Sequence, residues 1–113
     1  MAQLVFTTSL YAGADCITSF DFFPANQPFK LFIGVGNIGN AVSEPFEVYF
    51  VASLDGQTFA TDSVSFNGFT SGQTDIACVD MDGLAEDQYL FEVALIVNNQ
   101  IIQNTSYGAW VGF

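Results

Sequence analysis

The sequence predicts an all-β protein: a single domain over residues 1–113 that forms an immunoglobulin-like antiparallel β-sandwich of about seven strands. Three observations support this prediction. Apolar and polar residues alternate with period two in several runs, and no segment has the 3.6-residue period of an amphipathic helix. Turn residues recur about every eight to twelve residues, which is typical of a sandwich of short strands. A chain of 113 residues can also bury about two thirds of its unfolded surface in one core.

The N-terminal third of the chain is expected to contain two strands and a long connection. Residues 3–11, QLVFTTSLY, predict the first strand. Residues 15–28 are predicted to be an edge strand or a loop, because Pro24 and Pro28 cannot donate a hydrogen bond to a neighbouring strand. The run FKLFIGV predicts a strand over residues 29–35, with its odd-numbered residues on one face.

Three strands are predicted in the middle of the chain. Residues 46–54 alternate, and their inward residues are expected to be Phe46, Val48, Phe50, Ala52 and Leu54. Asp55-Gly56 is a strong hairpin signal, and it leads into a strand over residues 59–66. Residues 74–81, TDIACVDM, predict the next strand.

The last two strands are predicted over residues 89–97 and 100–113, joined by a turn at Asn98-Asn99. Tyr89 and Phe91 have the spacing of the tyrosine corner that opens strand F of immunoglobulin-like sandwiches. We expect Tyr89 to bury its ring and to bond a nearby backbone group through its hydroxyl. Phe91 takes the place of the second cysteine of antibody domains, so packing rather than a bridge should close the core there.

The net charge of −11 comes from twelve acidic residues and one basic residue, Lys30. Such a balance disfavours nucleic acids and anionic membranes as partners, since both are bound through lysine and arginine. No apolar run is long enough to span a bilayer, and the N-terminus lacks the basic region of a signal peptide. We therefore expect a protein kept in the cytosol or released by an unusual route. The separation of 62 residues between Cys16 and Cys78 would suit an inter-sheet disulfide. Because Cys78 does not fall on the usual partner strand and the expected compartment is reducing, we predict free buried thiols instead.

Residues 34–39, GVGNIG, match the G-x-G-x-x-G fingerprint of dinucleotide-binding loops. That fingerprint needs a helix directly after it, with the helix N-terminus at the pyrophosphate. Pro45 disfavours helical backbone at Glu44, and the next run alternates as a strand does. We therefore predict a strand that runs into a glycine-rich turn, and no nucleotide site.

Residues 28–98 resemble the CARDB family of bacterial, cell-adhesion-related immunoglobulin-like domains. The resemblance lies in turn signatures: N-x-G-N after a strand, D-G in a hairpin, and G-x-T before the next strand. The matching residues are Asn37, Gly39, Asn40, Asp55, Gly56, Gly72 and Thr74. The resemblance implies an immunoglobulin-like fold and no catalytic residues.

Residue chemistry argues against an enzyme, because the chain has no histidine and its hydroxyl groups have no evident base. No cofactor is expected other than Ca²⁺. The weak Ca²⁺ candidate is an acidic group of oxygen ligands around a glycine: Asp80, Asp82, Glu86 and Asp87. The alternative is a solvated loop.

Aromatic residues exceed what a core of this size is expected to bury, which predicts a protein contact surface. Its candidate residues are Phe23, Phe69, Tyr107, Trp110 and Phe113. Trp110 lies on the opposite strand face from Tyr107, so it is either core or contact.

The function we predict is that of a structural protein in a macromolecular assembly. A phage virion decoration or cement protein, bound to a capsid or tail surface or forming a homo-oligomer, fits a small acidic immunoglobulin-like chain. The alternative is an extracellular CARDB-type adhesion or ligand-binding module. Ca²⁺-assisted carbohydrate binding is a third possibility that rests on the acidic group alone.

Overall fold

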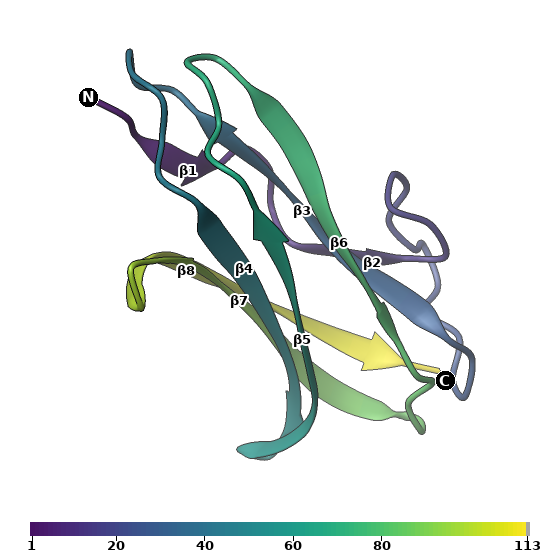
Figure 1. Ribbon diagram of the computed structural model, residues 1–113. Coiled ribbons are helices and arrows are strands. Elements are labelled where there is room, and N and C mark those ends of the chain that lie inside the picture. Colours follow the sequence, from purple (N-terminus) through teal and green to yellow (C-terminus); the bar gives the residue numbers. More distant parts are fainter. Residues whose placement is uncertain (113) are drawn as a thin grey trace.

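The computed structural model describes residues 1–112 and consists of eight strands in two antiparallel sheets (Figure 1). Sheet A contains β1 (Leu4–Phe6), β2 (Tyr11–Gly13), β3 (Phe29–Asn37) and β6 (Thr74–Met81). Sheet B contains β4 (Phe46–Leu54), β5 (Gln57–Phe66), β7 (Asp87–Val97) and β8 (Gln100–Val111). No residue of the described range is helical.

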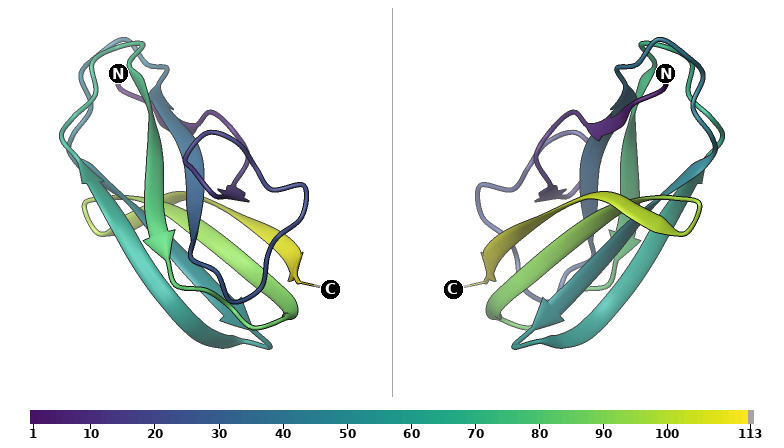
Figure 2. Two further views of the ribbon diagram at one scale, coloured as in Figure 1. Left: turned by 90° about the vertical axis from the view of Figure 1, so that its right-hand side faces the viewer. Right: turned by 90° about the vertical axis from the view of Figure 1, so that its left-hand side faces the viewer.

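The two sheets pack face to face as a sandwich (Figure 2). In sheet A, β3 is central, with β6 on one side and the short strands β1 and β2 in succession on the other. Sheet B has the order β5-β4-β7-β8. The predicted immunoglobulin-like sandwich is confirmed, with one strand more than the seven expected.

The additional strand arises because the predicted first strand is divided. Phe6 lies opposite Val35, but Tyr11 lies opposite Phe32, so the chain bulges between β1 and β2. The cause is Thr8, whose hydroxyl accepts the N–H of Gly34 at 2.8 Å in place of a backbone carbonyl. A Cβ on Gly34 would lie 2.4 Å from the Thr7 hydroxyl, so only glycine allows this contact.

The predicted inward faces form the core. Residues of β4 and β7 alternate between buried and more exposed positions as the sequence predicts. The buried set includes Phe29, Leu31, Ile33, Val35, Phe46, Val48, Phe50, Ala52, Tyr89, Phe91, Val93 and Leu95. Leu54, predicted to be inward, is half-buried beside the Asp55-Gly56 turn. Each fully buried large side chain contributes about 1.5 to 3 kcal/mol to folding.

The predicted tyrosine corner is confirmed. The Tyr89 ring is buried, and its hydroxyl donates a hydrogen bond to the backbone carbonyl of Ala85 at 2.8 Å. Burial, and then the negative charge of Asp87, raise the pKa of the Tyr89 hydroxyl, so it remains a donor. Phe91 is fully buried beside it, as predicted.

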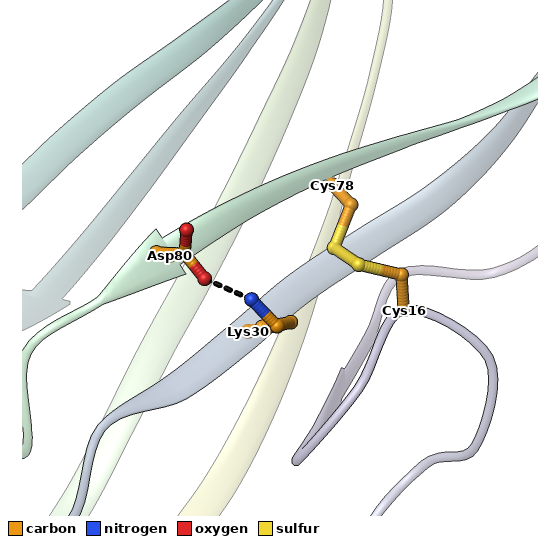
Figure 3. A network of polar contacts seen from close by, with 4 residues as sticks. All are labelled: Cys16, Lys30, Cys78 and Asp80. Carbon is orange, nitrogen blue, oxygen red and sulfur yellow. Dashed lines mark hydrogen bonds and ion pairs between the residues drawn. A yellow bond between two sulfur atoms is a disulfide. The ribbon is translucent and has the colours of Figure 1, made fainter.

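The prediction of free thiols is wrong, because Cys16 and Cys78 form a disulfide, with their Cα atoms 5.8 Å apart (Figure 3). The bond does not join the two sheets. Cys78 alternates with the buried Ala77 and Val79, so its side chain points to the outer face of sheet A. The turn that carries Cys16 folds back over this face, a path that the sequence pattern does not reveal.

The disulfide holds part of residues 14–28 against the outer face of sheet A. Phe32 points outward next to Cys78, yet it is only 4% exposed, with the Tyr11 ring 5.7 Å away. The Asp15 carboxylate accepts the backbone N–H groups of Thr18 and Ile17, which shapes the turn and lowers the Asp15 pKa. On the same face, the ammonium of Lys30 forms an ion pair with Asp80 (Figure 3).

The glycine-rich stretch is a strand end and a turn, as predicted. β3 continues to Asn37, a buried residue whose amide makes four hydrogen bonds. Its oxygen accepts the N–H groups of Gln3 and Gly39, and its nitrogen donates to the carbonyls of Ala41 and Phe69. Asn37 therefore ties the turn to the N-terminus and to the connection before β6, which explains an asparagine at this position.

The corner predicts two changes in stability. Tyr89→Phe should lower the free energy of unfolding by about 1 kcal/mol, because it deletes the partly buried hydrogen bond to the carbonyl of Ala85. Phe91→Ala should cost about 3 to 5 kcal/mol, because it leaves a cavity in the core. Urea denaturation followed by circular dichroism measures both. Tyr49→Phe, on the outer face of sheet B, is the matched control and should change stability by less than about 0.5 kcal/mol.

The disulfide predicts a dependence of stability on reductant. Breaking a link across 62 residues should cost about 4 kcal/mol, since the unfolded chain regains the entropy of a long loop. Urea denaturation with and without dithiothreitol measures the change. The Cys16→Ser/Cys78→Ser double variant should match the reduced protein and should not respond to dithiothreitol. Equal stability of the oxidised and reduced forms would contradict the prediction.

Candidate functional site

Two of the predicted contact residues, Phe23 and Phe69, lie in the core, so they cannot form an exposed surface. Phe23 enters the sandwich from the 14–28 connection and stacks on Phe91, with ring centroids 5.8 Å apart. Phe69 packs edge-on against Phe46 at 4.9 Å. Both belong to connections, where no alternation distinguishes a buried side chain from an exposed one.

The other predicted contact residues differ from one another. Tyr107 is partly buried and stacks on Phe91 at 6.2 Å from the inner face of β8. Trp110 points outward from β8 opposite Gln88 and is 50% exposed, so it does not belong to the core and stays a predicted contact residue. Phe113 lies outside the described residues.

The four predicted calcium ligands do not assemble into a site. Within residues 1–112, no group of three or more acidic, histidine or cysteine side chains could hold a metal ion. Asp80 is bound by Lys30 on the outer face of sheet A, whereas Asp87 begins β7 in sheet B. Between them, Leu84 turns into the core, while Asp82 and Glu86 remain exposed. The connection therefore has the character of a solvated loop.

The outer face of sheet B carries the exposed apolar residues that the structure brings together. Strand pairing places Tyr49, Ala94 and Asn104 in one row across β4, β7 and β8, and places Val51, Glu92 and Ser106 in a second row. With Ile101, these residues line an open hollow of about 340 Å³. We call this set the contact face: Tyr49, Val51, Glu92, Ala94, Ile101, Asn104 and Ser106.

The hollow exists because small residues lie between larger ones. Ala94 lies between Tyr49 and Asn104 in one cross-strand row. Its short side chain leaves a depression between these two longer side chains. Leu90, 42% exposed, lies on the same face towards the Trp110 end of β8, opposite Gly108. A Cβ on Gly108 would meet the Gln88 side-chain nitrogen at 3.6 Å, an ordinary van der Waals contact, so a small side chain would fit at this position.

The contact face holds one ionisable carboxylate, Glu92, in a chain with twelve acidic residues. It is therefore nearly free of the charge that covers the remaining surface. The opposite outer face differs, because Tyr11 and the Cys16 turn bury Phe32 there. An apolar sheet face with a few polar groups is suited to binding another molecule by shape and by hydrogen bonds.

Sequence reasoning missed three exposed apolar residues near this face: Leu90, Ile101 and Ile102. A signal for Leu90 was present, since alternation with the inward Tyr89 and Phe91 must direct it outward. The same argument does not apply to Ile101 and Ile102, because a register shift between Leu95 and Ile96 interrupts the alternation.

In the described part of the chain, no helix is long and apolar enough to cross a bilayer.

Comparison with known proteins shows a likeness in fold. No family model matches the chain, and no curated protein matches it. The crystal structure of the CARDB domain of PF1109 from Pyrococcus furiosus, in complex with di-metal ions, has a TM-score of 0.66 and 12% identity over 98% of this chain and 94% of that one. The solution structure of the same domain has a TM-score of 0.59 and 14% identity over 91% and 94%. The fold is therefore CARDB-like.

A third similar structure is a part of an enzyme. A putative β-galactosidase from Bacteroides fragilis has a TM-score of 0.62 and 14% identity over 88% of this chain, which corresponds to 15% of the enzyme. At this identity the likeness concerns the fold alone. Such sandwiches occur both as separate domains and as parts of large proteins, so fold does not assign function.

The acidic connection predicts that Ca²⁺ leaves stability unchanged. A ligand that binds only the folded state must raise the melting temperature, and the separated carboxylates offer no assembled site within residues 1–112. Thermal denaturation with millimolar CaCl₂, and with matched NaCl to correct for ionic strength, makes the measurement. A Ca²⁺-specific rise that disappears in Asp82→Asn would contradict this prediction and restore the calcium site.

Proposed function

We propose that this protein is a non-catalytic contact module, a structural component of a larger assembly that binds another protein through the contact face of sheet B. The observation that supports this proposal most is an exposed hollow that Tyr49 lines. The surface of the hollow is nearly uncharged, although the chain as a whole is acidic. Aromatic and aliphatic groups around a few polar atoms are typical of the centre of protein interfaces.

Decoration of a virion surface is the assembly we propose. A decoration protein adds contacts to a preformed particle and needs no catalytic group. The strongly negative net charge disfavours packaged nucleic acid as the partner and favours a protein surface. Half the residues of the chain are hydrophobic, and the charge keeps such a chain soluble before it binds.

The second candidate is an adhesion or ligand-binding module outside the cell, and the disulfide is the observation that favours it. Disulfides persist in oxidising environments, and Cys16–Cys78 fastens a connection to sheet A. Of the candidate ligands for such a module, a carbohydrate fits the hollow best, because Tyr49 offers a ring and Glu92, Asn104 and Ser106 offer hydrogen bonds.

The test compares two tyrosines of equal exposure. Tyr49 is 36% exposed on the contact face, and Tyr11 is 38% exposed on the opposite sheet. Virions and cell envelopes from the producing culture are separated on a density gradient, and the protein is detected in each fraction. Tyr49→Ala should weaken binding to the virion fraction about thirtyfold, the effect of losing about 2 kcal/mol at an interface centre. Tyr11→Ala should bind as the unmodified chain does.

The fractions distinguish the candidates. Recovery with virions supports the decoration proposal, and recovery with envelopes, lost in Tyr49→Ala, supports the adhesion module. Protein that stays unbound at the top of the gradient would overturn both. Equal loss of binding in the two tyrosine variants would show that the contact face is not the binding surface.

A further inference from the structure

The strand β8 forms one edge of sheet B, and among residues 1–112 it pairs only with β7. It is twelve residues long, the longest of the eight strands. Its single register irregularity lies near Ile102, so residues 103–111 follow β7 without interruption. The N-terminal segments touch the strand and the residue after it, since the Gln103 side chain accepts the N–H of Phe6 at 2.6 Å and the N–H of Gly112 donates to the Phe23 carbonyl at 2.7 Å. Between these points an edge strand of this kind presents backbone donors and acceptors to solvent.

Beyond the contact of Gln103 with Phe6, this edge lacks the charges and prolines that usually protect against pairing. Natural edge strands carry charges or proline, or they are very short. The edge strand β5 contains Asp62, and the edge strand β6 contains Asp75 and Asp80. The strands β1 and β2 have only three residues each. Residues 100–111, QIIQNTSYGAWV, contain no charge and no proline.

The charge of the whole chain indicates which partner fits the edge. Two copies that each carry −11 repel one another over most of their surfaces. At β8 no acidic side chain of one strand would face an acidic side chain of the other. A basic protein would instead be attracted to the acidic surfaces elsewhere, so the uncharged edge fits a second copy of this chain best.

The apolar residues of β8 are also arranged for self-pairing. Ile102 and Trp110 lie four residues on either side of Ser106 and are 48% and 50% exposed. An antiparallel pairing centred on Ser106 places Trp110 of each copy level with Ile102 of the other. A two-fold axis requires this kind of match, in which one patch is complementary to itself.

We propose that two copies pair antiparallel through β8, which joins their B sheets into one continuous sheet. The pairing satisfies exposed backbone groups of residues 103–111 and covers Ile102 and Trp110 at both ends. Contact along a single strand is smaller than a standard protein interface, so the dimer dissociates on dilution. The proposal concerns the edge of sheet B and does not rest on the proposed function of its face.

The test uses two matched serines. Ser106 and Ser63 are both exposed, and both lie on edge strands of sheet B with their side chains towards the outer face. In sedimentation equilibrium over a range of concentrations, the unmodified chain should dimerise reversibly. Ser106→Glu should raise the dimer dissociation constant about tenfold or more, because two like charges meet at the dyad. Ser63→Glu adds the same charge at the opposite edge and should dimerise as the unmodified chain does.

Two further measurements separate the edge from other effects. Thermal denaturation checks that Ser106→Glu remains folded, and Trp110→Ala, which adds no charge, should also weaken the dimer. Tyr49→Ala, the variant that tests the contact face, should leave dimerisation unchanged. A chain that stays monomeric at its highest soluble concentration would overturn the proposal. So would equal weakening by Ser106→Glu and Ser63→Glu.

Discussion

The packing of aromatic rings around Phe91 is the interaction on which the remaining structure depends. Its ring meets Phe23 from the 14–28 connection, Phe29 from β3 and Tyr107 from β8, at centroid distances of 5.8, 5.9 and 6.2 Å. These contacts join both sheets and the N-terminal connection at one point. The Phe91 ring occupies the place where antibody domains have a cysteine. The disulfide of this protein lies outside the core instead, where it holds the 14–28 connection against sheet A.

The shortage of basic residues determines how the rest of the chain is stabilised. With one lysine, which Asp80 already binds, ion pairs can contribute little, and exposed pairs are weak in any case. Burial and hydrogen bonding carry the fold instead. In the described residues, no buried side-chain polar atom lacks a hydrogen-bond partner. Asn37 is an example, since its one amide bonds the turn, the N-terminal segment and the connection before β6.

Features that depend on local pattern could be predicted from the sequence. The strands from β3 to β7 and their inward faces come from alternation. The hairpins come from turn residues with positive φ, at 50° and 81° for Asp55-Gly56 and 51° and 63° for Asn98-Asn99. The Cys16 bond, the burial of Phe23 and the separation of the acidic residues could not be predicted in this way. Each depends on the path of a connection, which tertiary packing decides.

The contact face and the β8 edge lie on the same sheet, and this has a consequence for binding. Pairing through β8 would place the contact faces of two copies side by side on one continuous sheet. A partner surface with repeated sites, as on a particle or a cell envelope, could then engage both faces at once. Linked binding of this kind raises the apparent affinity by about 10² to 10⁴ without any new contact. Two hollows of about 340 Å³, one on each copy, would in that way contribute to the same attachment.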